Sequence, residues 1–141
     1  MRMLLSIILF STILFSCEET DIIQFDYQST TMMGKTIITV RQDSVITSFN
    51  GRGTPTRTAR PTQKSEWLAL VNSVKDIDFT KIADLESPTN KRATDAAPFG
   101  TLIVTTKETV FTSSAFDGKN PHEMLMPLMN EIVKISESGK E

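Results

Sequence analysis

The stretch TLIVTTKETVFTSS, residues 101–114, predicts a β-hairpin and with it the fold. Apolar and polar residues alternate on both sides of Lys107-Glu108, which is the pattern of two strands joined by a turn. Pairing about that turn places Leu102, Val104 and Phe111 on one face, with Ile103 and Val110 on the other.

A polar loop is predicted at residues 115–120 after this hairpin, and a helix follows it. In Asn120-Pro121-His122-Glu123, Asn can cap, Pro takes the first helical position and Glu the third. Apolar residues then recur at helical spacing on one face: Leu125, Leu128, Met129, Ile132 and Ile135. Pro127 lies inside this pattern and lacks a backbone donor, so we expect a kink between Glu123 and Pro127.

The first half of the chain predicts a similar order of elements. Residues 22–31 read as a strand with Phe25 and Tyr27 on one face. Residues 35–41 and 44–49 then form a second hairpin around Gln42-Asp43. A helix opens at Pro61-Thr62 with Thr62 as its cap. Its apolar face comprises Trp67, Leu70, Val71, Val74 and Ile77, and a further helical turn follows Asp78.

These elements predict an α+β fold. We expect an antiparallel sheet of about five strands with two helices packed on one face, in the order hairpin-helix, hairpin-helix. A single domain spans residues 24–136, and residues 137–141 form a frayed C-terminus. The length of 141 residues fits one domain with a core of its own.

Two connecting segments have distinctive compositions. Residues 51–64 contain four basic residues and no acidic residue, so they could bind a phosphate, a sulfated glycan or a lipid headgroup. The alternative is an extended connection or an edge strand protected by charge and proline.

Residues 86–100 lack periodicity and mix Lys91, Arg92 and Asp95 with apolar residues. We expect this long loop to fold back onto the domain and to be the best place for a site.

The N-terminal segment predicts export. A short basic start, Met1-Arg2-Met3, precedes an apolar run from Leu4 to Phe15, which is typical of a signal peptide over residues 1–16. The run is shorter than the roughly 20 residues needed to span a bilayer. Cys17 is the only cysteine, so it has no disulfide partner within the chain.

Leu14-Phe15-Ser16-Cys17 resembles the lipobox of bacterial lipoproteins. The resemblance implies that Cys17 carries a diacylglyceryl thioether and an acylated amine, with residues 17–23 as a lipidated tether. The alternative is an ordinary signal peptide that is cut elsewhere. Glu18-Glu19 resembles the surface-export signal of lipoproteins in Bacteroidota, although such charges also keep a tether in water.

The mature chain is also similar to small lipoproteins of Bacteroidota, and this resemblance implies no particular activity. It rests on Leu85-Glu86-Ser87-Pro88-Thr89, on Thr94-Asp95-Ala96-Ala97 and on Ser114-Ala115-Phe116-Asp117-Gly118. The lipoprotein resemblance implies a lipid-anchored location in the cell envelope, at the periplasmic or surface leaflet of the outer membrane.

The chain contains few residues or motifs that are typical of catalysis. The chain has one histidine and lacks a nucleophile elbow, a phosphate-binding loop and a His-Glu-x-x-His run. Asp95, Asp117, His122 and Glu123 could meet as a metal or acid–base cluster if the long loop folds over the last helix. Alternatively, His122 is a capping residue and Asp117-Gly118 a plain turn. We assign the methionines, including Met32-Met33, to packing rather than to a copper site or an adaptable binding face.

The expected function is that of a membrane-anchored, non-enzymatic binding or accessory domain. The expected ligand-binding residues are Lys91, Arg92, Asp95, Asp117 and His122, with no cofactor and no metal. The expected partners are the membrane, through Cys17, and an envelope protein or a small ligand. The net charge of −2 gives no reason to expect nucleic acid. The alternatives are a small metal-binding or hydrolytic protein using Asp95, Asp117 and His122, and an envelope inhibitor of a protease or lysozyme.

Overall fold

The computed structural model describes residues 21–139 and shows an α+β fold built on one seven-stranded sheet. The strands are β1 (Ile22–Thr31), β2 (Gly34–Arg41), β3 (Ser44–Gly51), β4 (Thr56–Pro61), β5 (Phe99–Thr106), β6 (Val110–Thr112) and β7 (Phe116–Asp117). The α-helices are α1 (Lys64–Ser73) and α2 (Met126–Glu137), and three short 3-10 turns are η1 (Phe79–Asp84), η2 (Lys91–Thr94) and η3 (Glu123–Leu125). The predicted signal peptide 1–16, Cys17 and most of the tether 17–23 lie outside the described residues.

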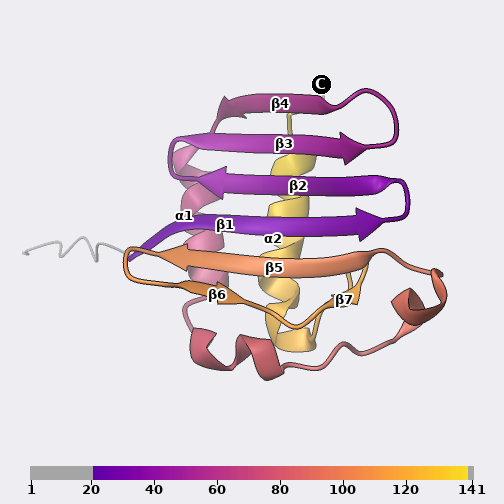
Figure 1. Ribbon diagram of the computed structural model, residues 1–141. Coiled ribbons are helices and arrows are strands. Elements are labelled where there is room, and N and C mark those ends of the chain that lie inside the picture. Colours follow the sequence, from indigo (N-terminus) through magenta and orange to yellow (C-terminus); the bar gives the residue numbers. More distant parts are fainter. Residues whose placement is uncertain (1–20, 140–141) are drawn as a thin grey trace, which may run out of the picture.

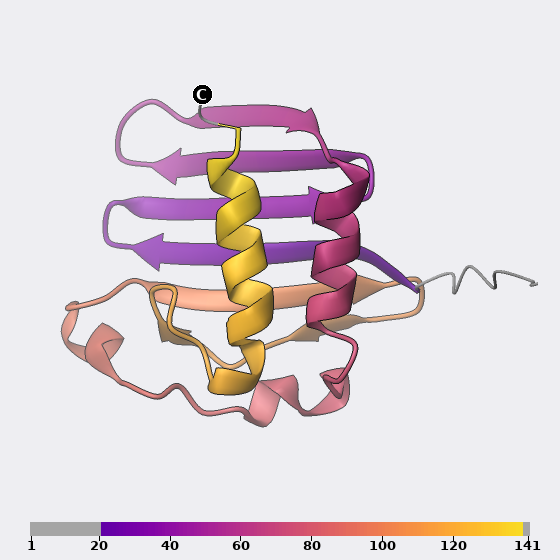
Figure 2. The same cartoon turned by 180° about the vertical axis from the view of Figure 1, so that it is seen from behind.

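The strands lie in the order β4-β3-β2-β1-β5-β6, and β7 also pairs with β5. Each of these pairings is antiparallel. Figure 1 shows the sheet from its open side, and Figure 2 shows both α-helices crossing its other face. The predicted class and the placement of the helices are therefore confirmed, but the expected number of about five strands is too low.

The two strands beyond the expected five have different origins. β4 forms in the basic segment, which is therefore the charged edge strand of the second interpretation. β7 forms where a loop was expected at residues 115–120, and that expectation was wrong. β7 has two residues, too few for alternation to show in the sequence, and it pairs with the start of β5 rather than with its neighbour in the chain, β6.

The core lies between the sheet and the helices, and it contains the residues that the periodicity selected. Phe25 and Tyr27 of β1 are buried, as are Leu102 and Val104 of β5. All five predicted positions of the last helix are buried, at Leu125, Leu128, Met129, Ile132 and Ile135. On the predicted face of the first helix, Trp67, Leu70 and Val74 are buried, and Val71 and Ile77 pack against the core. The helix itself ends at Ser73, so Val74 is its C-cap and Ile77 lies beyond it. Within the described residues, no helix is both long and apolar enough to cross a bilayer.

Both helix starts differ from the prediction. The N-cap of α1 is Gln63 rather than Thr62, and it forms a capping box with Glu66. The Thr62 hydroxyl instead donates to the Arg41 carbonyl at 2.7 Å.

In the last helix, the α-helical part begins at Met126, so Pro127 lies in the first turn and needs no donor there. The expected interior kink was therefore wrong, and the 3-10 turn η3 precedes the helix instead.

Arg60 joins the edge strand β4 to both helices. Its guanidinium donates to both carboxylate oxygens of Glu66 in α1, at 2.9 and 2.8 Å. The same group donates to the carbonyl of Ile135 and to the hydroxyl of Ser138 at the end of α2. Residues 138 and 139 are thus held against β4, whereas residues 140–141 of the predicted frayed terminus lie outside the described residues. The ion pair lowers the pKa of Glu66 and raises that of Arg60.

Candidate functional site

A buried carboxylate organises the long loop between η1 and β5. Asp117 of β7 is 5% exposed, and each of its oxygens accepts two hydrogen bonds. One oxygen accepts from the Thr89 hydroxyl and from the Lys91 amide, the latter at 2.7 Å. The other accepts from the amide and the guanidinium of Arg92, both at 3.0 Å. These bonds fix the start of η2 on β7.

The surroundings of Asp117 favour the charged form of its carboxyl group. Burial acts to raise the pKa of this carboxyl, but the hydrogen bonds from Thr89, Arg92 and Lys91 outweigh it. The net result is a pKa far below the usual value for aspartate. The hydrogen bonds that hold the loop therefore also favour the ionised carboxylate.

Close packing around residues 116–118, here called the β7 turn, fixes the entry to β5. The amide of Gly118 donates to the Pro98 carbonyl at 2.8 Å, and the Tyr27 hydroxyl donates to the Gly118 carbonyl at 2.6 Å. A β-carbon on Gly100 would lie 2.3 Å from that same carbonyl oxygen, so this position has room for glycine alone. Residues 98–100 are thus held against the β7 turn.

The predicted loop, residues 86–100, does fold back onto the domain. It contains η2, and its last two residues already belong to β5. The amides of Asp95 and Ala96 donate to the Arg92 and Lys91 carbonyls, which extends the fixed region as far as residue 96. The structure brings Lys91, Arg92 and Asp117 together, but the Arg92 guanidinium and the Asp117 carboxylate bind each other.

His122 takes no part in this network. It caps η3, with its Nδ1 accepting from the Met124 amide at 3.2 Å. Among residues 21–139, no group of three His, Cys, Asp or Glu side chains is placed to hold a metal ion. The structure does not assemble Asp95, Asp117 and His122 into the cluster that the alternative function needs.

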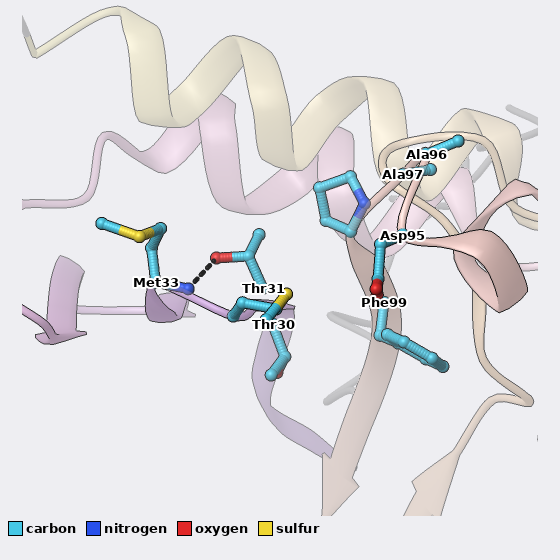
Figure 3. Close-up of a pocket in the computed structure, with 9 residues that line it drawn as sticks. Thr30, Thr31, Met33, Asp95, Ala96, Ala97 and Phe99 are labelled. Carbon is cyan, nitrogen blue, oxygen red and sulfur yellow. Dashed lines mark hydrogen bonds between the residues drawn. The ribbon is translucent and has the colours of Figure 1, made fainter.

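A hollow of about 510 Å³ opens at the end of the sheet where β1 turns into β2. One wall is the turn at residues 30–33, and the other is the segment at residues 95–99, which the β7 turn and η2 hold in place. Figure 3 shows Thr31 and Met33 on one side of the hollow, and Ala96 and Ala97 on the other. We call this hollow the groove.

The groove is lined mainly by apolar side chains. Met32, Met33 and Phe99 remain 75%, 56% and 46% exposed, so the prediction that Met32-Met33 is packed was wrong. The hydroxyls of Thr30 and Thr31 and the carboxylate of Asp95 are the polar side-chain groups among the lining residues. Asp95 is held at φ 55° as the residue that ends η2, a conformation that Asp and Asn tolerate better than most residues.

The sequence predicted one wall of the groove as part of a site, but not the other wall. Asp95 was expected to bind a ligand, and it does line the groove. Met32-Met33 carried a usable signal, because a turn between two strands is normally polar and this turn exposes two large apolar side chains. Residues 30–33 face residues 95–99 because β1 lies beside β5. These two strands are far apart in the sequence, so no local pattern predicts the groove.

No protein-family model, curated protein or solved structure matches this chain.

Proposed function

We propose that the protein is a lipid-anchored binding domain of the cell envelope and that the groove is its binding site. The observation that carries the binding role is the hollow between residues 30–33 and 95–99. Its volume is within the range of small binding sites, and its apolar walls with a few polar groups have the composition of such sites. Exposed apolar side chains gathered in one place are typical of interaction surfaces.

The rigid support of one wall strengthens this proposal. Residues 95–98 are connected through backbone hydrogen bonds to η2 and to the β7 turn, and η2 is held in turn by Asp117. A wall that is fixed before binding loses little conformational freedom on binding, which favours affinity. Asp117 therefore acts as a positioning residue for the groove.

The anchor is proposed from the sequence. Leu14-Phe15-Ser16-Cys17 resembles a lipobox, and two acyl chains suffice for stable membrane attachment. The envelope location, in the outer membrane, follows from this resemblance and from Glu18-Glu19. The folded domain then acts as an accessory protein that presents its groove from the membrane surface. We propose no catalytic step.

Filling the groove should weaken binding of an apolar peptide. The test uses the full chain in phosphatidylcholine nanodiscs and a fluorescein-labelled acetyl-Leu-Phe-Leu peptide as an apolar probe. Ala97 lines the groove, so Ala97→Trp places a large ring in it. We expect the Kd from fluorescence anisotropy to rise at least about tenfold, equivalent to about 1.4 kcal/mol.

The control variant is Leu68→Trp, which adds the same side chain at an exposed position of α1 that does not line the groove. It should bind the probe like the unmodified protein. Equal binding by the Ala97→Trp and unmodified proteins, with empty nanodiscs subtracted, would show that the groove is not the site.

A further inference from the structure

We infer that the groove opens away from the anchoring membrane and receives an apolar segment of a partner polypeptide that carries a basic residue. This inference deepens the proposed function and rests on it, because it needs both the anchor at Cys17 and the groove as the binding site. Its direction comes from the path of β1, and the chemistry of the occupant comes from the walls of the groove.

The path of β1 sets the direction. The strand begins at Ile22, five residues after Cys17, and ends at Thr31 in the groove wall. Five residues span at most about 18 Å even when fully extended. The ten residues of β1 cover about 30 Å. The segment from Cys17 to Ile22 is therefore shorter than the strand, so the domain cannot stand upright with its groove pressed into its own bilayer.

The two ends of the sheet differ in exposed apolar surface, although both carry charge, and Arg52 lies beside Met33 at the groove end. The end where β1 begins carries charged turns at Asp43 and at Lys107-Glu108, and Lys107 pairs there with Asp21 at 3.9 Å. Charged turns are compatible with the water and headgroups next to a membrane. The opposite end exposes Met32 and Met33. Figure 1 shows the β1–β2 turn and the β3–β4 loop together at that end.

The exposure of the walls favours a polypeptide over a small molecule as the occupant. Met32 is three-quarters exposed beside the groove, so only a partner that extends beyond the hollow can cover it. Methionine side chains are flexible and adapt to varied apolar partners. Asp95 is the one charged residue among the nine that line the groove, which makes a basic residue the complementary partner group.

The direction can be measured by energy transfer in vesicles. Thr54→Cys labels the β3–β4 loop at the groove end without touching the groove, and Glu108→Cys labels the turn at the other end. In each variant the introduced thiol is the only reactive one, because Cys17 is acylated. The full lipidated chain is placed in phosphatidylcholine vesicles that carry headgroup acceptors. A donor dye at position 54 should transfer energy to the headgroup acceptors with at most about half the efficiency of a donor at position 108. The reason is that the two ends of the sheet are roughly 30 Å apart.

Flotation with the vesicles and an intact mass that begins at Cys17 with acyl chains establish the anchor before the comparison is made. Protein that does not float would overturn the anchor, and the inferred direction with it. Protein that floats but shows equal or stronger transfer from position 54 would overturn the direction alone.

The chemistry of the occupant is tested with two labelled peptides, acetyl-Leu-Phe-Lys-Leu amide and acetyl-Leu-Phe-Glu-Leu amide. The anchored full chain should bind the lysine peptide about threefold to fivefold more tightly, the size expected of one exposed charge pair. Asp95→Asn keeps a residue that tolerates the left-handed backbone and should abolish that preference. The absence of a preference in the unmodified protein, or its persistence in Asp95→Asn, would overturn the inference while leaving apolar binding intact.

Discussion

Replacing Arg60 by alanine should lower the free energy of unfolding by about 2–3 kcal/mol. The guanidinium makes a bidentate ion pair with Glu66, and it also donates to Ile135 and Ser138. The side chains of Arg60 and Glu66 are 24% and 13% exposed, so the loss should exceed that of a surface pair. In the variant, the Glu66 carboxylate remains in a mostly buried position without its cation.

The loss of stability caused by Arg60→Ala should become smaller as the pH falls. Hydrogen bonding to Arg60 lowers the pKa of Glu66 in the folded protein. A lowered folded pKa contributes stability that is fully present above the unfolded value of 4.5 and is lost as the pH falls through the folded value. The difference between Arg60→Ala and the unmodified protein, measured by urea unfolding, should therefore be constant near neutral pH and shrink below about pH 4.5.

Arg57→Ala is the matched control for this prediction. Arg57 is an exposed arginine of the same edge strand, and its removal should cost less than about 0.5 kcal/mol. If the two variants unfold at the same urea concentration, Arg60 does not join β4 to the helices in the way the hydrogen bonds indicate.

Replacing Asp117 by asparagine should release the loop that forms one wall of the groove. An amide of the same shape presents an NH₂ group where one carboxylate oxygen now accepts two hydrogen bonds. Buried donors then lose their partners, and we expect the Tm to fall by roughly 5–10 °C at neutral pH. Hydrogen exchange of the Lys91 and Arg92 amides, which donate to Asp117, should accelerate most.

In the unmodified protein, low pH should remove the same stabilisation by protonating Asp117. The folded pKa of Asp117 is far below its unfolded value of 3.8, so its contribution is complete above about pH 4 and disappears as the pH falls further. Asp117→Asn should lack this part of the acid dependence. The control is Asp95→Asn, which changes an exposed carboxylate in the same loop and should leave exchange at residues 91 and 92 unchanged. Slow exchange at both amides in Asp117→Asn would contradict the anchoring role of this carboxylate.

The sequence predicted the elements whose signal is local and periodic. The buried faces of both helices, the first strand and the two hairpins follow from the spacing of apolar residues, and the structure confirms them. The pair Val104–Phe111 lies opposite across the hairpin as expected. Periodicity succeeds there because each element has to bury one face against the same core.

The sequence could not predict contacts that join distant parts of the chain through single polar groups. Arg60 meets residues of α2 that are more than 70 positions away, and no local pattern distinguishes it from the exposed Arg57. Asp117 was singled out as a ligand-binding residue, yet its oxygens accept hydrogen bonds from the loop that holds the groove wall. A polar residue in a loop gives the same sequence signal whether it faces a ligand or its own chain.

The most direct test of the groove as a binding site is the methyl spectrum of the methionines during a titration. The full chain, with ¹³C-labelled methionine methyl groups and anchored in nanodiscs, is titrated with acetyl-Leu-Phe-Lys-Leu amide. Met124 is as exposed as Phe99 but lies outside the groove, so it serves as an internal control, together with the buried Met129. Binding in the groove predicts shifts at Met32 and Met33 that saturate with peptide while Met124 and Met129 stay in place. Shifts at Met124 instead, or unmoved signals from Met32 and Met33, would contradict it.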